Sequence, residues 1–574
     1  MTAKQSPSAK GMNLFLRVFW EKYGMMKSIM ILSSVMFSVS AHAYRYDFEY
    51  DGMYFLLLSL EKQECVLTGF NSVSRDTVVI PEIINYLGRE IKVVDIFDGW
   101  ELEKVYDTIK YLSIPGSINL LNSNIFADLP ELRTLVIEGA GRELRFYGDC
   151  QYPKLEYLKL GRDVEPPIFK EHPMLKKVEI CDSLEYLQEH YFEGCTNLES
   201  VDLGDHLKYV GADAFSYTKI DSLEVPPNVE RIVGGAFENT PLKYVHIQKS
   251  QDGLSEPFVM ERAFGQMLEK IVIERPITTI DYNVEVLSPL RSDQLKDIEL
   301  INIGKIPKML FNGCKGIKTI KISGEISEIG SCAFKQCEEL ESFQNIEGLE
   351  PYNFDNIAYI GSNAFGGCKN MTHLIMPESL TTIERGVYSG CTFPEILVIP
   401  DAVKAIEEEA FRGCENVKLL KIGKNCKRIG KMAFYKDGII PESNGIIPEI
   451  MCESVVPPGI LDYTFSGATF MHAVLYVPEE SLEAYSSAAG WKQFWNIKTL
   501  DQAGIDEVHV GNKYSIQVQG GELVIQGAEN SSVRVFTPSG KIVYNVSCYK
   551  GDPIRLGSGI YIININGTSH KISL

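Results

Sequence analysis

The sequence predicts a β-rich solenoid of the α+β class, with 22–23 residues per coil, followed by a small antiparallel β-sandwich. Three observations predict this fold. An aromatic residue recurs at a nearly constant spacing, and a short apolar strand pattern recurs between the aromatic residues. After residue 503, alternating apolar and polar residues with Gly turns take over. Self-similarity at a fixed period is the sequence signature of a stacked repeat array.

The composition is that of a folded chain with room for several domains. Of the 574 residues, 45% are hydrophobic and 23% are charged, which is the balance of a folded protein rather than a disordered one. The formal net charge is −20. Because phosphates require clustered Lys and Arg, this acidic balance argues against nucleic acid as a partner.

The first residues have the pattern of an export signal. In MMKSIMILSSVMFSVSAHA, Lys27 precedes a short apolar run that ends in Ala41-His42-Ala43, a small-residue cleavage pattern. We therefore expect residues 1–43 to be a signal peptide, with Met25 or Met26 as the true start. The alternative is an N-terminal membrane anchor. Once the signal is removed we expect no transmembrane span, and a secreted or outer-surface protein, with a periplasmic location as the alternative.

The aromatic anchor is the first recurring feature, and its spacing sets the length of the coil. Most neighbouring anchors are 22 or 23 residues apart, a spacing of 47 corresponds to two coils, and spacings of 27 and 31 indicate short insertions. Phe126 also fits, since it precedes the first of them by 66 residues. The anchors are Phe192, Phe215, Phe237, Phe264, Phe311, Phe334, Phe365, Tyr388, Phe411, Phe434 and Phe465.

The second recurring feature is the pattern L-x-x-L-x-L between anchors. It stands as LEYLKL from residue 155, LKKVEI from residue 175 and IKTIKI from residue 317. Because successive strand residues point to opposite faces, the last apolar positions of the pattern share one face. Pro or Gly then stops the strand, as at Pro226, Pro377 and Pro400.

Together these features predict stacked coils. One coil of 23 residues cannot bury its strand face alone, so the coils must stack and share a continuous core. The anchor and the Ala before it, as in Ala214-Phe215 and Ala236-Phe237, are expected to fill the inner space on the far side of each coil. The Ala must be small because the aromatic ring lies close by.

The repeats resemble those of a known family. The stretches ISEIGSCAFKQCEELESF and IAYIGSNAFGGCKNMTHLIMP share the core Ile-Gly-x-x-Ala-Phe-x-x-Cys, at residues 329–337 and 360–368. They look like the BspA-like leucine-rich repeat of surface proteins from Bacteroides-type bacteria, over about residues 90–480. The resemblance implies a leucine-rich repeat array at the cell surface, which we place at residues 96–475.

The same resemblance implies a cap at each end of the array. Residues 44–95 resemble the strand-rich opening cap of the family, and residues 476–502 resemble the segment that closes such arrays. In the closing segment, Trp491, Phe494 and Trp495 are expected to cover the last open coil.

Residues 503–574 form the C-terminal piece. The stretches VRVFTPSGKIVYN and LGSGIYIININGTSHKISL are expected to form short antiparallel strands, hence a small β-sandwich. They are similar to the C-terminal sorting domain of the type IX secretion system, although the ending Lys571-Ile-Ser-Leu departs from the usual basic end. The alternative is a β-sandwich without a sorting role.

Cysteines recur with the repeat. Six of the thirteen lie three residues after an anchor, which stacks them about 4.8 Å apart on successive coils. We interpret them as a ladder of buried thiols, with disulfides as the alternative, because parallel stacked side chains rarely have the torsion that a disulfide needs. The six are Cys195, Cys314, Cys337, Cys368, Cys391 and Cys414.

The sequence offers no pattern of catalytic or metal-binding residues. It has no C-x-x-C pair, no H-E-x-x-H, no G-x-S-x-G and no Walker-type loop. We therefore predict a protein that is not an enzyme, with no cofactor and no metal site.

The outward residues of the strand pattern are the candidate binding surface. They vary from coil to coil while the inward residues do not, and free drift of an unselected surface would look the same. Our hypothesis is an adhesin-like protein that binds a host matrix or bacterial surface protein; the alternatives are a glycan-binding surface protein and a structural envelope component. The candidate partner-binding residues are Tyr157, Lys159, Asp202, Tyr244, His246 and His373.

Overall fold

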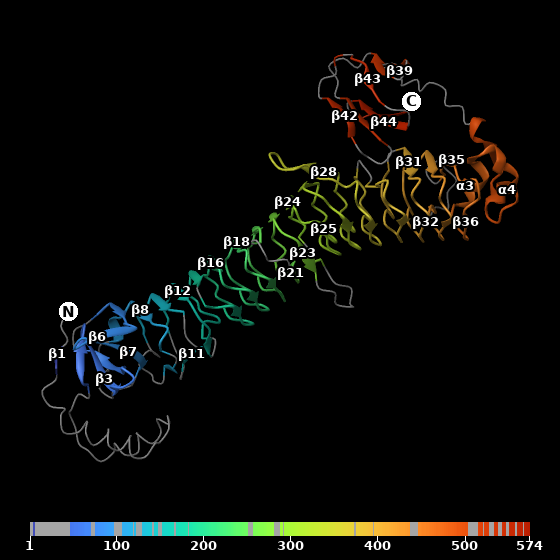
Figure 1. Cartoon of the computed structure of the whole chain (residues 1–574). Helices are drawn as coiled ribbons and strands as arrows, with labels where there is room; N and C mark the ends of the chain where they lie inside the picture. Colours follow the sequence, from blue (N-terminus) through green and yellow to red (C-terminus); the bar gives the residue numbers. More distant parts are fainter. Residues whose placement is uncertain are drawn as a thin grey trace. The chain divides into compact units, whose positions relative to one another are not determined.

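The structure of the protein is a computed structural model, divided into two compact units, Met1–Leu242 and Lys243–Leu574 (Figure 1). Apart from residues 4–5, the predicted signal peptide lies outside the described residues, as does Phe126. The described residues are 4–5, 46–70, 75–96, 106–118, 120–121, 129–139, 143–146, 152–165, 168–181, 183–250, 257–279, 288–290, 292–371, 375–393, 395–436, 446–502, 515–519, 522–526, 533–537, 542–546, 550, 552–556, 560–565 and 568–573.

The first unit is built almost entirely of short strands. Its elements are β1 Lys4–Gln5, β2 Phe48–Tyr50, β3 Met53–Ser59, β4 Glu64–Phe70, β5 Thr77–Val79, β6 Ile83–Tyr86, β7 Arg89–Ile96, the 3₁₀ helix η2 Tyr106–Thr108, β8 Tyr111–Ile114, β9 Leu120–Leu121, β10 Thr134–Ile137, β11 Leu144–Phe146, β12 Tyr157–Leu160, β13 Val164–Glu165, β14 Lys177–Ile180, β15 Tyr186–Leu187, β16 Ser200–Asp202, β17 Tyr209–Val210, β18 Ser222–Val225 and β19 Arg231–Ile232.

Each coil of this unit contributes to two ladders of parallel strands. The L-x-x-L-x-L strands form a long sheet in the order β16-β14-β12-β10-β8-β5, with their partners in parallel register. Two- and three-residue strands form a second ladder, which runs through β9, β11 and β13 and through β15, β17 and β19. The second ladder was not predicted from the sequence.

The opening segment consists of short paired strands. Strands β2, β3 and β4 pair antiparallel in turn, and β6 and β7 form an antiparallel pair. Phe48 stacks between Phe55 and Tyr86, with ring centroids 5.5 and 4.2 Å away. Strand β5, inside this segment, already pairs in parallel with β8 and so belongs to the long sheet.

The second unit repeats the same design and adds short helices. Its elements are β20 Tyr244–Ile247, β21 Phe258–Met260, β22 Lys270–Ile273, β23 Ile277–Thr279, β24 Asp297–Ile301, β25 Lys305–Ile306, β26 Thr319–Ser323, β27 Glu328–Ile329, β28 Ser342–Asn345, β29 Tyr359–Ile360, β30 Thr382–Ile383, β31 Ile396–Ile399, β32 Ala405–Ile406, β33 Leu419–Ile422, β34 Arg428–Ile429, β35 Glu449–Cys452, β36 Gly459–Ile460, α3 Gly467–His472, β37 Val474–Val477, η4 Glu479–Ser481, α4 Leu482–Ser487, η5 Trp491–Gln493, β38 Asn496–Thr499, η6 Leu500–Gln502, β39 Ser515–Gln519, β40 Glu522–Gln526, β41 Val533–Phe536, β42 Ile542–Val546, β43 Ile554–Arg555, β44 Ile560–Ile565 and β45 Thr568–Ser573.

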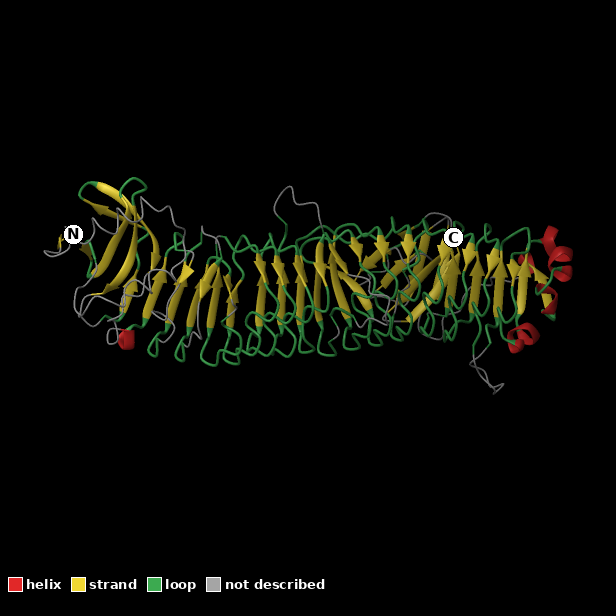
Figure 2. Ribbon diagram, turned by 90° about the horizontal axis from the view of Figure 1, so that it is seen from below, coloured by secondary structure: helices red, strands yellow, loops and turns green. Residues whose placement is uncertain are grey.

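Within this unit the coils again form long and short parallel ladders (Figure 2). The long strands run in the orders β20-β22-β24-β26-β28 and β31-β33-β35-β37-β38, and the short ones in the orders β25-β27-β29 and β30-β32-β34-β36. The last strands form two antiparallel sheets, β39-β40-β43 and β42-β41-β44-β45. Their buried apolar side chains, among them Leu523, Val535 and Ile563, form one cluster.

The core of the coils has the predicted composition. In the coil of LEYLKL, Leu155, Leu158 and Leu160 are all fully buried. The aromatic anchors stack ring on ring, for example Phe192 on Phe215 at 5.4 Å and Phe411 on Phe434 at 5.2 Å between centroids. Stacked pairs of this kind add about 0.5–1.5 kcal/mol beyond the burial of their surface.

One anchor escaped the sequence analysis. Phe169 lies 23 residues before Phe192, is fully buried and stacks on it at 6.1 Å. Its coil has Ile168 where seven of the eleven predicted anchors follow Ala, but Phe192 and Phe311 lack that Ala as well.

The turn around each anchor has an unusual backbone that no sequence pattern predicted. In all eleven coils with a predicted anchor, the residue two positions before it has a left-handed φ, between +42° and +73°. Only two of these residues are Gly; Asp213, Glu409 and Met432 are among the others. A second left-handed residue often follows the anchor by two positions, as at Gly194, Gln336 and Gly413.

These left-handed residues let the turn bond to the next coil. The anchor N–H of Phe334 donates to the carbonyl of Ala364 at 2.8 Å, in the following coil. The N–H groups two residues before and two residues after it, at Cys332 and Gln336, donate likewise to Ser362 at 2.9 Å and Gly366 at 2.7 Å. The same three bonds join other neighbouring coils, so the turns form a third ladder of hydrogen bonds.

The insertion predicted between Phe334 and Phe365 folds back onto its own unit. Pro351 and Asn353 form isolated bridges with Ser323 and Glu325 of the preceding coil. Phe354 packs edge-on against Phe343 at 5.4 Å between ring centroids. The added residues therefore lie beside the coils and leave the stacking of anchors intact, with Phe334 and Phe365 5.3 Å apart.

The closing cap differs from the prediction at one residue. Trp491 is fully buried and Phe494 is 4% exposed, so both cover the last coil as expected, but Trp495 is 76% exposed. The cause is the approach to β38: Phe494 faces inward, and adjacent residues in extended chain point to opposite sides. The Trp495 backbone N–H donates to the Phe470 carbonyl at 3.0 Å, which fixes the chain in this orientation.

The turn geometry generates a stability prediction. Gly413→Ala should lower the free energy of unfolding by about 1–2 kcal/mol, because an L-residue other than Gly is strained at positive φ. Gly413 has φ +70°, and an added Cβ would meet only Gly390 atoms at 3.9 Å or beyond, so the cost is conformational. Urea unfolding followed by circular dichroism measures the difference in free energy of unfolding between the variant and the parent chain.

The matched control is Gly459→Ala in β36. Gly459 has no left-handed φ, and an added Cβ would approach only the Lys427 carbonyl, at 3.8 Å. This variant should keep or raise the stability of the parent chain. Equal losses in the two variants would contradict a conformational origin.

Candidate partner-binding surface

The long sheet of the first unit aligns its outward side chains in two rows. In one row Tyr157 lies between Thr134 and Lys177 on the neighbouring strands. In the other, Lys159, Glu179 and Asp202 follow one another across β12, β14 and β16. Leu158, Val178 and Leu203, their apolar neighbours in sequence, are buried beneath them, whereas Val201 is half-buried.

Tyr157 is held by contacts with two residues of the next strand. Its hydroxyl donates to Glu179 Oε2 at 2.5 Å, and the Lys177 ammonium lies 2.6 Å from Glu179 Oε1 and 5.7 Å from the Tyr157 ring centroid. The hydrogen bond from Lys177, then that from Tyr157, holds the pKa of Glu179 below its usual value. Burial, followed by the bond to Glu179, raises the pKa of Tyr157.

The long sheet of the second unit carries a compact group of four charges. Lys270 lies 3.1 Å from Asp297 and 3.7 Å from Glu299, and Lys321 lies 3.2 and 3.0 Å from the same carboxylates. The group is electrically balanced and partly exposed. Such surface groups contribute little to stability, but they present a fixed pattern of donors and acceptors.

The six predicted binding residues do not all lie in one place. Tyr157, Lys159 and Asp202 share the long sheet of the first unit. Tyr244 and His246 share β20 of the second unit, where His246 Nε2 lies 3.4 Å from Glu274 Oε1. His373 lies outside the described residues.

The second ladder of the first unit adds aromatic residues that the sequence analysis missed. Tyr186 is 60% exposed, and its ring centroid lies 6.1 Å from that of Tyr209. The Arg231 guanidinium lies 6.0 Å from the centroid of the Tyr209 ring. The signal for this row is the doublets Tyr-Leu, Tyr-Val and Arg-Ile at spacings of 23 and 22, two residues each.

The recurring cysteines lie inside the coils and donate hydrogen bonds to them. Cys337, Cys368 and Cys391 donate to the carbonyls of Phe311, Phe334 and Phe365, the anchors of the preceding coils, each at 3.1 Å. None of the eleven cysteines in the described part of the chain is in a disulfide. Burial raises the pKa of Cys391 to about 12 and that of Cys368 well above its usual value, so both are protonated at neutral pH.

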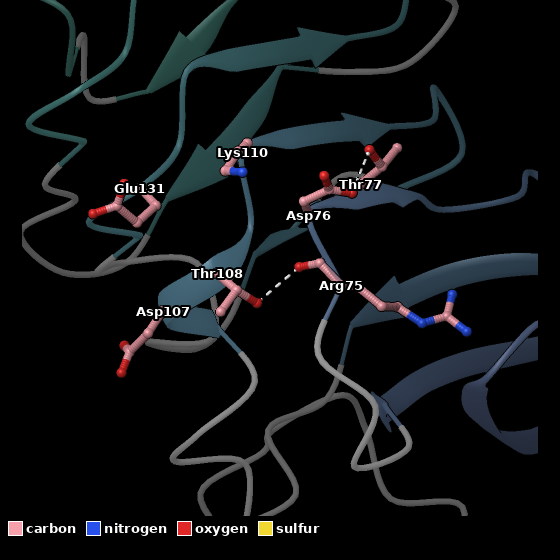
Figure 3. Close-up of a pocket in the computed structure, with 7 residues that line it drawn as sticks. All are labelled: Arg75, Asp76, Thr77, Asp107, Thr108, Lys110 and Glu131. Atoms are coloured by element: carbon pink, nitrogen blue, oxygen red, sulfur yellow. Dashed lines mark hydrogen bonds between the residues drawn. The ribbon is translucent and has the colours of Figure 1, made fainter.

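A shallow polar hollow of about 580 Å³ lies beside β5 and η2 (Figure 3). Cations and carboxylates both line it, and the Arg75 side chain points away from Asp107 and Glu131 (Figure 3). Thr108 is occupied in a hydrogen bond to the Arg75 carbonyl at 2.9 Å. The lining does not converge on one centre, so we assign it no chemistry. Its residues are Arg75, Asp76, Thr77, Asp107, Thr108, Lys110 and Glu131.

No cluster of three or more His, Cys, Asp or Glu side chains is arranged to hold a metal ion in the part of the chain that the structure describes. No helix there is both long enough and apolar enough to cross a membrane.

A family model matches the repeats. The model of the BspA type leucine rich repeat region matches in six copies, over residues 141–258, 258–356 and 341–444, which together span more than half of the 574 residues. No curated protein matches the chain.

Several solved structures resemble the chain at low identity. A leucine rich cell surface protein from Faecalibacterium prausnitzii is 17% identical, with 69% of this chain and 93% of that chain covered and a TM-score of 0.25. A leucine-rich repeat protein from Bacteroides ovatus is 17% identical, with coverage of 71% and 94% and a TM-score of 0.27. The pneumococcal vaccine antigen PcpA is 17% identical, with coverage of 79% and 98% and a TM-score of 0.25.

The buried thiols generate a reactivity prediction. With iodoacetamide at mildly alkaline pH, Cys368 and Cys391 should stay unmodified in the folded chain, since the reactive thiolate is suppressed and covered. Cys332, which is only partly buried, should react before either of them. Peptide mass spectrometry measures each site, and unfolded chain supplies the fully reactive control. Equal rates at Cys332 and Cys368 without denaturant would contradict the ladder.

The Glu179 group generates a pH prediction. Its pKa lies below the ordinary 4.5, so its stabilising contribution is present above that pH and is lost as the pH falls through the lowered pKa. Glu179→Gln should therefore lower the melting temperature at pH 7 by an amount that corresponds to at most about 1 kcal/mol, and the difference should vanish in acid. The control is Glu480→Gln, an exposed carboxylate without an ion pair in the described structure, which should show no such pH-dependent difference.

Proposed function

Because the chain belongs to the BspA-type leucine rich repeat family, we propose that it is a non-enzymatic surface protein that binds a protein partner through the outward rows of its long sheets. The partner we expect is a host matrix protein or another bacterial surface protein. Repeat arrays present long regular surfaces that serve binding, and family membership by itself does not name the ligand.

The single observation that carries the proposal is the ordered face around Tyr157. Its ring is fixed by Glu179 and Lys177 on the next strand while it remains partly open to solvent. A tyrosine held in one orientation loses little entropy on binding, and Tyr is enriched among the residues that dominate interface energies. Lys159, two residues further along the same strand, and Asp202, two strands away in the row of Lys159, add opposite charges that can select a partner.

A second candidate function is glycan binding, and two observations favour it. Trp495 is exposed rather than committed to the cap, and Tyr186 offers an exposed ring beside Tyr209. Flat aromatic faces of this kind can stack on sugar rings. A structural role in the envelope remains the third candidate, with self-association in place of a soluble ligand.

We also propose a route to the surface. Residues 1–43 would act as the export signal, and the C-terminal strands, as a β-sandwich, would act as a sorting domain of the type IX kind. The two antiparallel sheets with one apolar cluster support a separate small domain after the coils. An outer-surface location follows from this route, with the periplasm as the alternative.

Tyr157→Ala tests the binding surface. The full chain is passed over a panel of immobilised host matrix proteins and bacterial surface proteins, and the dissociation constant is measured for each partner that binds. We expect the substitution to weaken binding about tenfold, which corresponds to about 1.4 kcal/mol, because an ordered ring is lost from the face.

The control is Tyr217→Ala, which removes an exposed tyrosine from an anchor turn rather than from the sheet. This variant should bind as the parent chain does. Equal losses in the two variants, or no binding to any protein of the panel while glycans bind, would contradict the proposal.

A further inference from the structure

The last coil and the closing cap of the second unit, which include β36, α3 and α4, carry an unusual number of exposed apolar side chains. Figure 1 shows these three elements near one another. Of twenty large apolar side chains exposed in the described residues, seven lie between residues 455 and 495. Terminal repeats of such arrays need a polar outer face for solubility, so this concentration departs from what a cap requires. The seven are Val455, Val456, Leu461, Tyr463, Met471, Leu482 and Trp495.

The loop that carries Val455 and Val456 accepts hydrogen bonds from three buried side chains at its backbone carbonyls. Tyr485 Oη donates to the Ser454 carbonyl at 2.8 Å, Ser481 Oγ to the Val455 carbonyl at 2.7 Å, and Trp491 Nε1 to the Pro458 carbonyl at 2.7 Å. All three donor residues are buried. The backbone of the loop is therefore fixed by the cap.

The fixed backbone leaves the valine side chains outside. Val455 is 54% exposed and Val456 77%. Leu482, at the start of α4, follows Ser481 and so borders the loop through the bond from that serine to Val455. Rigid, solvent-exposed apolar groups can be buried by a partner without paying for new order in the loop.

Carboxylates border this apolar loop, and they differ from those on the coils. On the coils, carboxylates pair with lysines of the next coil, as Glu185 does with Lys208 at 2.9 Å. Asp462, Glu479, Glu480 and Glu483 are exposed and have no ion pair in the described structure. From residue 446 to 495 the chain has six carboxylates against one lysine and no arginine. Lys427 of the preceding coil also adjoins the loop, since its carbonyl accepts from the Gly459 N–H at 2.9 Å, whereas Lys424 is paired with Asp401. The four carboxylates without an ion pair still outnumber Lys427 and Lys492, so the rim attracts positive charge.

We infer that the loop of residues 455–459, together with Leu482, is a docking site for a protein segment with an apolar centre flanked by Lys or Arg. This rests on the proposed function and adds a second contact, of stated charge, to it. An acidic rim favours such a partner over a second copy of this chain, whose identical rim would be repelled across a symmetric contact. It also disfavours an anionic lipid surface.

The test uses the full chain and a short labelled peptide with a Leu-Ile-Trp centre flanked by lysines. Fluorescence anisotropy gives the dissociation constant. We expect Val456→Ser to weaken binding about tenfold by removing a central apolar contact. The double variant Glu480→Lys with Glu483→Lys should weaken it by a similar factor, and added NaCl should reduce the affinity of the parent chain.

Two controls distinguish binding at this loop from nonspecific binding to exposed apolar side chains. Leu87→Ser removes a 78% exposed side chain from the turn between β6 and β7 and should leave the affinity unchanged. A peptide with the same centre flanked by glutamates should bind at least about tenfold more weakly. Equal affinity for both peptides, or an equal effect of Leu87→Ser, would overturn the inference.

Evidence that something else occupies the loop would also overturn the inference. Sedimentation velocity that shows a dimer lost in Val456→Ser would assign the loop to a second copy. Binding to phosphatidylglycerol vesicles that is lost in the same variant would assign it to a membrane. The proposed function fails separately, in the panel with Tyr157→Ala, which lies in the other unit and does not involve this loop.

Discussion

Backbone hydrogen bonds between the turns that hold the aromatic anchors are the constraint on which the coils depend. Three N–H groups per turn, two residues apart, must all point at the next coil. The chain achieves this with left-handed residues around the anchor, at a cost of about 1–2 kcal/mol for each residue other than Gly. Each buried bond made in return avoids an unsatisfied polar group, so residues as different as Glu409 and Met432 are accepted there.

This constraint explains the division between fixed and variable positions. Once the turns are in register, the rings stack and the thiols of Cys337 and Cys368 reach the carbonyls of the preceding anchors. The aromatic rings and thiols inside the coils are thereby engaged in packing and in hydrogen bonds between coils. What remains free to vary is the outward side of each strand and the exposed surface of the cap, which is where both proposed contacts lie.

The buried residues of the coils could be predicted well from the sequence, because every coil must bury the same positions in order to stack. Leu158 and Leu160 are buried as the period-two pattern requires. The spacing of the anchors indicated where each coil lies. Phe169 was missed although it lies 23 residues before Phe192, so the anchor spacing could have predicted it. The second ladder was missed because two-residue strands such as Tyr186–Leu187 are too short to show the alternation of a strand, and only their recurrence every 22–23 residues marks them.

The surface was harder to predict, for physical reasons. That Tyr157, Lys159 and Asp202 lie on the outward side follows from alternation, but the bond from Tyr157 to Glu179 depends on the register between coils. Trp495 was assigned to the cap by its residue type, whereas one step along an extended chain turns it to solvent. The left-handed residues of the turns could not be recognised in the sequence, because many residue types occupy these positions.

The central claim is that the coils form a display surface for partners outside the cell. Protease treatment of intact cells of the producing organism, with mass spectrometry of the released peptides, tests it most directly. The account predicts release of peptides from residues 96–475 without lysis. Release of those peptides only after lysis would place the protein inside the envelope and contradict the account.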